Sequence, residues 1–119
     1  MAYPVDITGK RIAREYNIAA TTSASAAQLL NFPVTNTGMP GDQREIIIAA
    51  NGATITFNFG DSSVAASTTA TSNVLPDGNF TLLSGAIYSL RLLPTQNYVS
   101  VKTASGSGTA IIQLTTPLV

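Results

Sequence analysis

The stretch REIIIAANGATITFNFGDSSV, residues 44–64, contains the two patterns that decide the fold. Its first half is a continuous apolar run bounded by turn residues, which indicates a buried strand. Asn51-Gly52 follows, and this dipeptide is a strong signal for a two-residue hairpin turn. From Ile55 to Phe59 every second residue is large and apolar, with Thr or Asn between, which indicates a half-buried strand. We therefore expect two antiparallel strands joined by a tight turn.

Strand-like segments separated by turn signals recur along the rest of the chain. They are residues 27–35, 79–83, 86–93, 97–104 and 109–115, with one or two short edge strands in 62–74. In 97–104, Val99 and Val101 are expected to point inward, and Tyr98, Ser100 and Lys102 outward. Runs at intervals of about 8–12 residues are typical of a sandwich or barrel. We predict an all-β fold, a single antiparallel β-sandwich of jelly-roll or immunoglobulin-like type, over residues 25–119.

Residues 1–24 differ from the remainder, and we predict that they form an extended N-terminal arm. They hold Lys10, Arg11 and Arg14, half of the basic residues of the chain. The run KRIAREYNIAA could form a short packed helix, but Pro and Gly before it and TTSAS after it interrupt that pattern. An extended arm, or one that becomes ordered on a partner, is the preferred alternative. The N-terminus shows no apolar segment of a secretory signal.

The composition narrows the function classes. The chain has 119 residues, a single-domain length, with 45% apolar and 10% charged residues, whereas about 25% charged is usual. Its polar residues are mainly 16 Thr, 11 Ser and 8 Asn, and its formal net charge is zero. Nucleic-acid binding needs clustered basic residues and a membrane span needs about 20 apolar residues. We expect neither partner.

The sequence contains no Cys and no His. Disulfides, thiol nucleophiles and zinc-thiolate sites are thereby excluded, together with the commonest metal ligand and general base. We predict no cofactor, no metal and no catalytic residues.

Gly60-Asp61-Ser62-Ser63 resembles fragments of two serine hydrolase signatures. A serine hydroxyl needs a base, normally His, before it acts as a nucleophile. Only Ser-Lys chemistry would remain, with Lys10 or Lys102. A turn closed by a side-chain-to-backbone hydrogen bond from Asp61 or a Ser is the favoured interpretation. The enzymatic hypothesis rests on Asp61 and Ser62.

The other polar residues give weaker evidence for a catalytic, metal or glycosylation site. A glycosidase needs two carboxylates at a fixed separation, but the acidic candidates lie in or beside turns and are expected to be solvated. Asp61 and Asp77 lack the density of oxygen ligands found in calcium loops. Residues 79–81 match a glycosylation sequon, which arises often by chance. The acidic candidates are Asp42, Glu45, Asp61 and Asp77.

Three turn motifs follow one another along the chain in an order that resembles a known group of proteins. Phe59–Ser62 ends a strand with Phe-Gly-Asp-Ser before a Thr/Ala-rich stretch, and Leu75–Gly78 is a Leu-Pro-x-Gly turn. Ser105–Thr109 forms a Gly-Ser-Gly-Thr hairpin before the last strand. With this order, the region 44–115 resembles small bacteriophage virion proteins of the capsid decoration, or cement, type. The C-terminal TTPLV departs from the group, whose members often end in a Gly-rich acidic tail.

The resemblance implies a non-enzymatic β-sandwich, commonly trimeric, that sits where major capsid subunits meet and stabilises the shell. The implied partners are the major capsid protein and further copies of this chain, and the implied location is the virion, assembled in the host cytoplasm. The residues expected in the capsid-contacting arm are Tyr3, Lys10, Arg11, Arg14 and Tyr16. Tyr88 and Tyr98 are interface candidates, since tyrosine is enriched at interfaces. The alternative is a receptor- or carbohydrate-binding module of a phage fibre or adhesin, with these two tyrosines against sugar rings.

Overall fold

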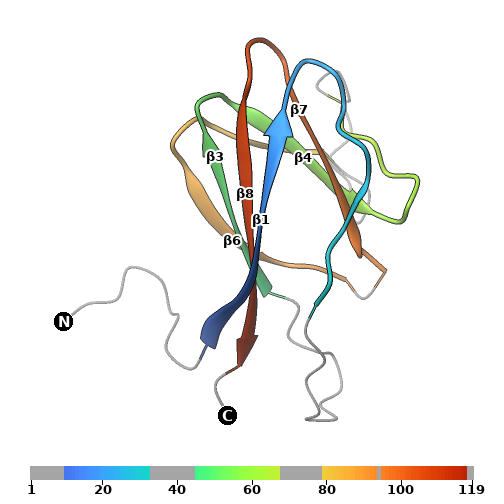
Figure 1. Cartoon of the computed structure of the whole chain (residues 1–119), viewed down its shortest axis with the longest axis vertical. Coiled ribbons are helices and arrows are strands. Elements are labelled where there is room, and N and C mark those ends of the chain that lie inside the picture. Colours follow the sequence, from blue (N-terminus) through green and yellow to red (C-terminus); the bar gives the residue numbers. More distant parts are fainter. Residues whose placement is uncertain (1–9, 33–44, 68–78, 94, 118–119) are drawn as a thin grey trace, which may run out of the picture.

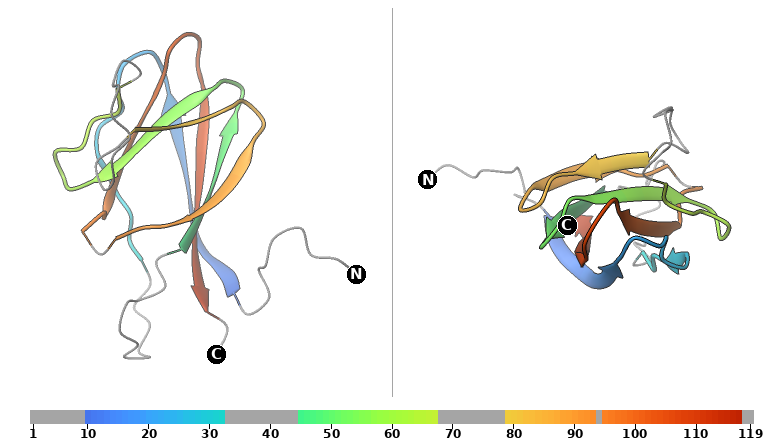
Figure 2. Two further views of the ribbon diagram at one scale, coloured as in Figure 1. Left: turned by 180° about the vertical axis from the view of Figure 1, so that it is seen from behind. Right: turned by 90° about the horizontal axis from the view of Figure 1, so that it is seen from above.

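The computed structural model describes residues 10–32, 45–67, 79–93 and 95–117, which form two antiparallel sheets facing each other (Figures 1 and 2). The strands are β1 (Lys10–Ala20), β2 (Gln28–Leu29), β3 (Glu45–Asn51), β4 (Ile55–Gly60), β5 (Asn79–Leu82), β6 (Ile87–Arg91), β7 (Tyr98–Thr103) and β8 (Gly108–Pro117). One sheet has the order β1-β8-β3-β6 and the other β2-β7-β4-β5. We call them sheet A and sheet B. The predicted all-β sandwich is confirmed.

The strand order is that of a jelly roll. The pairs β1·β8, β2·β7, β3·β6 and β4·β5 are all antiparallel, as in one long hairpin whose two arms wrap together around a core. The further pairs β3·β8 and β4·β7 join the wrapped arms into the two sheets. Eight strands in two sheets with these connections distinguish the jelly roll from the immunoglobulin-like alternative.

The core lies between the sheets and is filled by alternate residues of the central strands. In β4, Phe57 is fully buried and its ring stacks on Phe59 at a centroid distance of 6.2 Å. The predicted strand of the IIIAA run is confirmed, but its burial alternates. Ile46 and Ile48 point into the core, whereas Ile47 is only partly buried on the outer face of sheet A.

The arm prediction needs correction for residues 10–24. Residues Lys10–Ala20 are extended, as expected, but they form β1 and pair with β8 from Lys10↔Pro117 to Ala20↔Gly108. Alternate side chains of β1 reach the core, including Tyr16, Ile18 and the fully buried Ala20. The short-helix alternative is wrong for the same reason. The sandwich therefore begins at Lys10 and not at residue 25, and residues 1–9 lie outside the described residues.

The Asn51-Gly52 turn is also not a hairpin within one sheet. Gly52 has the positive φ of +89° that such a turn needs, but β3 belongs to sheet A and β4 to sheet B. The turn therefore carries the chain from one layer to the other. A tight turn fixes the reversal of the chain, while the pairing of each strand is decided by the rest of the fold.

Residues 65–67 lie against part of the outer face of sheet B. Asn58 Nδ2 donates to the Ala65 carbonyl at 3.2 Å, and the Ser100 hydroxyl accepts from the Ala66 N–H at 3.0 Å. Ser100, expected to point outward, does so but is fully buried by this segment. Residues 62–67 contain no strand, contrary to expectation, and 68–78 lie outside the described residues. The strand expected at 27–35 is limited to Gln28–Leu29 within the described part of that segment.

Candidate functional site

The Gly60–Ser63 segment, the possible active-site serine of the sequence, is a turn closed by Asp61. The Asp61 Oδ1 atom accepts the Ser63 N–H at 2.8 Å and the Ser63 hydroxyl at 2.6 Å. The Val64 N–H donates to the Asp61 carbonyl at 3.0 Å. The side-chain and backbone hydrogen bonds from Ser63 lower the pKa of Asp61. The carboxylate stabilises a turn, as predicted, and these bonds make it a weaker base.

A hollow of about 420 Å³ lies beside this turn. Asn58, Gly60, Asp61, Ser63, Val64 and Ala65 line it. Asn58 is only 8% exposed, and its Oδ1 is a buried acceptor with no hydrogen-bond partner in the structure. The Nδ2 atom of the same side chain donates to the Ala65 carbonyl. The described residues contain no group of three or more His, Cys, Asp or Glu side chains that could hold a metal ion.

Of the residues predicted for the capsid-contacting arm, the structure describes the side chains of Arg14 and Tyr16. The Tyr16 hydroxyl accepts the Asn31 N–H at 2.9 Å, and its ring packs against the core. Arg14 is exposed beside a register shift in the pairing of β1 with β8. Lys10 and Arg11 lie in β1, and Tyr3 lies outside the described residues.

The two interface candidates lie in different sheets. Tyr88 is in β6, where its ring packs on Phe80 of β5 at a centroid distance of 5.1 Å. This contact closes one side of the sandwich between the two sheets. Tyr98 is in β7 of sheet B, paired with Leu29 and Gly60. Of the two, only Tyr88 lies beside a larger apolar surface.

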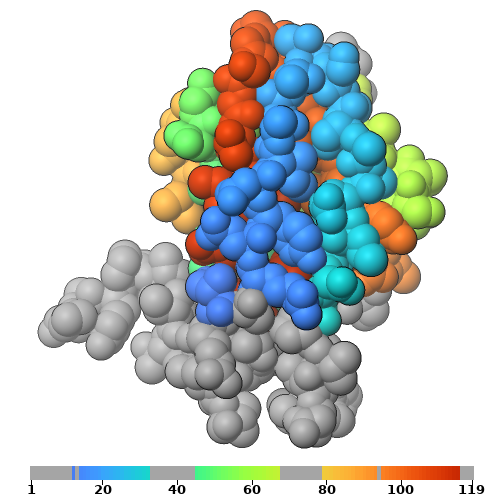
Figure 3. Space-filling model, viewed as in Figure 1, coloured from blue at the N-terminus to red at the C-terminus, as the bar shows by residue number. Residues whose placement is uncertain are grey.

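That surface follows β6 and the residues at its two ends. Leu83, Ile87, Tyr88 and Leu93 are 69, 68, 49 and 47% exposed, and we call these four residues the β6 surface. They account for most of the large apolar side chains that are exposed in the described part of the chain. In the space-filling view, β6 lies at the rim of the molecule beside β3 (Figure 3). Ile87 points to the outer face of sheet A, whereas Tyr88, paired with the buried Ile48, points to the rim between the sheets, so the β6 surface spans both sides of this edge. Exposed apolar side chains that gather in one place mark an interaction site, whereas scattered ones do not.

The outer face of sheet A extends this surface. Ile87 is paired with Ala49, and Ala49 with Ile111 of β8, so these three side chains form one row across the strands. Ile47 lies in the next row, between Ser89 and Gln113. Ala49, Ile111 and Ile47 are partly exposed. An apolar strip therefore runs from the β6 edge over the middle of the sheet.

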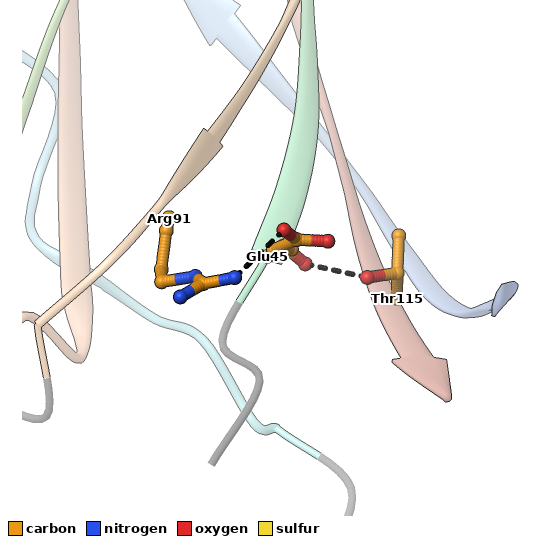
Figure 4. Close-up of polar contacts among 3 residues, drawn as sticks. All are labelled: Glu45, Arg91 and Thr115. Atoms are coloured by element: carbon orange, nitrogen blue, oxygen red, sulfur yellow. Dashed lines mark hydrogen bonds and ion pairs between the residues drawn. The ribbon is translucent and has the colours of Figure 1, made fainter. Parts of the chain in front are cut away.

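The charge at this edge is compensated internally. Arg91 of β6 donates to a Glu45 carboxylate oxygen across the strand pair at 3.1 Å, and the Glu45 carbonyl accepts the Thr115 hydroxyl at 2.7 Å (Figure 4). The Arg91 side chain is 60% exposed, so the ion pair contributes no more than about 1 kcal/mol to stability. Its effect is to leave the edge without net charge.

Among the described strands, β6 is the last of sheet A and pairs with β3. The Ala50 N–H donates to the Ala86 carbonyl at 3.2 Å, which sets the phase of the ladder between β3 and β6. Tyr88 and Leu90 then direct their backbone groups toward β3, while Ile87, Ser89 and Arg91 direct theirs away from it. Edge strands in stable monomers are usually protected by several charges, Pro or a bulge. The sequence of β6, IYSLR, has one charge and no Pro.

Sequence reasoning identified the strand and Tyr88 but missed Ile87 and the edge. A signal was present, since Ile87 alternates with the outward-pointing Ser89 and Arg91 and is therefore an apolar residue on the polar face. The edge position depends on the pairing of β6 with β3, which are far apart in the sequence, and no local pattern reports it.

No family model and no curated protein matches the chain. Among solved structures, a chain from work titled "Bacillus endospore appendages form a novel family of disulfide-linked pili" aligns with a TM-score of 0.46 and 15% sequence identity, over 100% of this chain and 99% of that one. At this similarity the alignment carries no functional argument.

The expectation of a phage capsid decoration protein finds no support in the comparisons and is corrected here. The structure that aligns is a bacterial appendage and not a capsid protein, and the motifs behind the expectation are turn motifs that any β-sandwich can use. The resemblance itself, the capsid partner and the virion location stay predictions that the comparisons do not test. Among the described residues no helix is long and apolar enough to cross a membrane.

Proposed function

We propose that this chain is a non-enzymatic structural protein, a jelly-roll subunit that associates with further copies of itself through the β6 surface. The observation that carries the proposal is the concentration of large exposed apolar side chains on residues 83–93. Burying one such side chain completely contributes about 1.5–3 kcal/mol. Several are needed together, because association costs at least about 4 kcal/mol in lost translational and rotational freedom.

The polar groups of the molecule support a structural role more than a chemical one. Asp61 is engaged in its own turn, and Ser100 and Asn58 hold residues 61–67 on sheet B. Arg91 and Glu45 bridge two strands. Each of these groups has a role in holding the fold.

The proposal is tested by measuring molar mass against protein concentration, using size-exclusion chromatography with light scattering. We expect the natural chain to associate and the double variant Ile87→Ser/Leu93→Ser to remain a monomer with an unchanged unfolding transition. Ile12→Ser is the matched control, because Ile12 is 45% exposed but lies in β1, at the opposite edge of sheet A. A natural chain that stays monomeric at every concentration, or an association that both variants weaken equally, would contradict the proposal.

A further inference from the structure

We propose that the hollow beside the turn after β4 binds a primary ammonium group, the charged end of a lysine side chain or of an alkylamine, between the Asp61 carboxylate and the Asn58 side-chain oxygen. Six of the residues 58–65 line this hollow, which we call the Asp61 hollow. It lies against sheet B, whereas β6 is in sheet A, and the two are on opposite sides of the molecule in Figure 1. Binding at the Asp61 hollow therefore does not depend on the proposed self-association.

The Asp61 carboxylate has one oxygen available to a ligand. Its Oδ1 atom accepts two hydrogen bonds from Ser63, at 2.8 Å from the backbone N–H and at 2.6 Å from the hydroxyl, which occupies both lone pairs of that oxygen. Within the described residues the Oδ2 atom accepts no hydrogen bond. The bonds from Ser63 also lower the pKa of Asp61, so this carboxylate is charged at neutral pH. The hollow therefore carries a negative charge with an open acceptor.

Asn58 is the second polar group of the hollow. Its side chain lines the hollow and is only 8% exposed, and its Oδ1 is a buried acceptor without a hydrogen-bond partner in the described part of the chain. The Nδ2 atom donates to the Ala65 carbonyl at 3.2 Å, so turning the amide over would lose that bond. A buried acceptor left unpaired is costly, and in native proteins a water, an ion or a ligand commonly meets such a group. An N–H donor inside the hollow would satisfy the Asn58 oxygen.

The rest of the lining fits the alkyl chain of an amine. Val64 and Ala65 are apolar, and Gly60 has no side chain to fill the space beside β4. The volume of about 420 Å³ is within the range of small-ligand sites, about 300–1,000 Å³. A lysine side chain or an alkylamine packs its apolar stem against an apolar surface and keeps its charged end at a polar group. The hollow offers both kinds of surface.

Two other cations fit this set of acceptors less well. An arginine side chain binds a carboxylate best through two parallel hydrogen bonds, but Oδ1 of Asp61 is already occupied by Ser63. Calcium needs about six to eight oxygen ligands, and the side chains of the lining supply oxygens only from Asn58, Asp61 and Ser63. A primary ammonium is compact, and its rotatable N–H groups donate to single acceptors in several directions. It is the cation that these acceptors favour.

The first experiment titrates the isotope-labelled natural chain with n-butylamine at neutral pH and is followed by NMR. We expect saturable shifts of the Asn58 side-chain amide and of the Ser63 backbone amide, with NOEs from the butyl protons to the Val64 methyl groups. The matched ligand is n-butanol, which has the same apolar chain without the charge and should cause no saturable shift. Sodium chloride at the same concentrations controls for ionic strength.

The second experiment removes the charge and keeps the turn. Asp61→Asn retains a side-chain oxygen that can accept both hydrogen bonds from Ser63, and it should weaken the binding of n-butylamine about tenfold or more. Glu15→Gln is the matched control, because Glu15 is an exposed carboxylate of β1 in the other sheet. This variant should bind n-butylamine like the natural chain. Should Asp61→Asn fail to fold, the NOEs to Val64 in the natural chain decide alone.

A capped tripeptide, acetyl-Ala-Lys-Ala-amide, distinguishes the two sources of the ammonium group. Tighter binding of the peptide than of n-butylamine assigns the hollow to a lysine side chain of a protein, and equal or weaker binding assigns it to free amines. The absence of saturable shifts with both ligands, equal shifts with n-butanol, or unchanged binding by Asp61→Asn would overturn the proposal. The molar mass of the natural chain tests the proposed self-association separately, so either proposal can fail without the other.

Discussion

At the scale of single residues, the turn after β4 is stabilised by the Asp61 carboxylate, which accepts two hydrogen bonds from Ser63. These bonds favour the charged form, so the pKa of Asp61 in the folded protein lies below its ordinary value of 3.8. A lowered folded-state pKa means that the contribution of this group to stability is complete above the unfolded pKa. It is lost as the pH falls through the folded pKa.

We predict that Ser63→Ala raises the pKa of Asp61 toward its ordinary value, because it removes the side-chain hydrogen bond, which is the larger of the two effects that lower this pKa, and keeps the backbone one. A carboxyl NMR titration measures this shift directly. The difference in unfolding free energy between the natural chain and Ser63→Ala should also narrow as the pH falls below 3.8. Ser62→Ala is the matched control, and an equal shift of the Asp61 pKa in that variant would show the assignment of the turn to be wrong.

Ser100 is the second polar residue whose role can be isolated. Its hydroxyl donates to the Ser25 carbonyl at 2.7 Å and accepts the Ala66 N–H at 3.0 Å, in a position that is fully buried. Ser100→Ala leaves both backbone groups without this partner and should cost about 1–3 kcal/mol of unfolding free energy. Ser89→Ala, at an exposed position, should change stability by less than about 0.5 kcal/mol. Denaturant unfolding measures both.

Ser100→Ala should also change the hydrogen exchange of a neighbouring backbone amide. Without the Ser100 hydroxyl, the Ala66 amide should exchange with solvent faster than in the natural chain, since the segment 61–67 loses one of its attachments to sheet B. An Ala66 amide that remains equally protected in Ser100→Ala would contradict the role given to this hydroxyl.

Single residues were predicted from the sequence where their partners are close along the chain. The Asp61 turn was expected because its hydrogen bonds span two residues. The burial of Ser100 was not, because the covering residue Ala66 is 34 positions away. The alternation of apolar and polar residues correctly predicted that the Ser100 side chain points outward. It did not predict that another segment of the chain would cover this side chain.

At the scale of elements, the β7–β8 turn depends on a close approach at Gly108. A Cβ atom at this position would lie 2.5 Å from the Asn51 carbonyl oxygen and 3.0 Å from the Ala53 nitrogen, both backbone atoms. We predict that Gly108→Ala forces the β3–β4 turn and the start of β8 apart, at a cost of about 1–3 kcal/mol, as in other overpacked sites.

Gly106→Ala is the matched variant for this prediction. Gly106 has a φ of +73° and open space around its Cβ position, so its substitution costs only backbone strain, about 1–2 kcal/mol. The unfolding free energies of both variants distinguish the cost of the close contact at Gly108 from the cost of backbone strain at Gly106. A Gly108→Ala variant as stable as the natural chain would show that the two turns do not lie as close as described.

The sequence predicted the positions of the strands better than it predicted which strands pair with one another. The strands β5, β6 and β7 fall within their predicted segments, whereas β3, β4 and β8 overlap theirs and extend beyond them by one to three residues. The strand β1 was missed because its charged residues suggested an arm, although Tyr16, Ile18 and Ala20 alternate inward. At Asn51-Gly52 the dipeptide predicted the turn correctly, but the layer change of the chain there depends on the pairing of β3 with β8.

At the scale of the whole molecule, the jelly-roll order places β6 at an edge and gathers apolar side chains on it. The sequence predicted a sandwich and left two topologies open, because strand order is decided by contacts between distant segments. The edge position of the candidate surface was inaccessible to sequence reasoning for the same reason. Ile87 becomes significant only when β6 is known to be the last described strand of sheet A, paired with β3.

The central claim is that the β6 surface, with its exposed apolar side chains, is covered by another copy of the chain. Residue-resolved hydrogen exchange at low and high protein concentration tests it most directly, with the Ser89 amide as the reporter and the Leu90 amide, which points toward β3, as the internal control. The account predicts that the Leu90 amide is protected at both concentrations, while the Ser89 amide exchanges rapidly at low concentration and becomes protected at high concentration. A Ser89 amide that exchanges equally fast at both concentrations would contradict it.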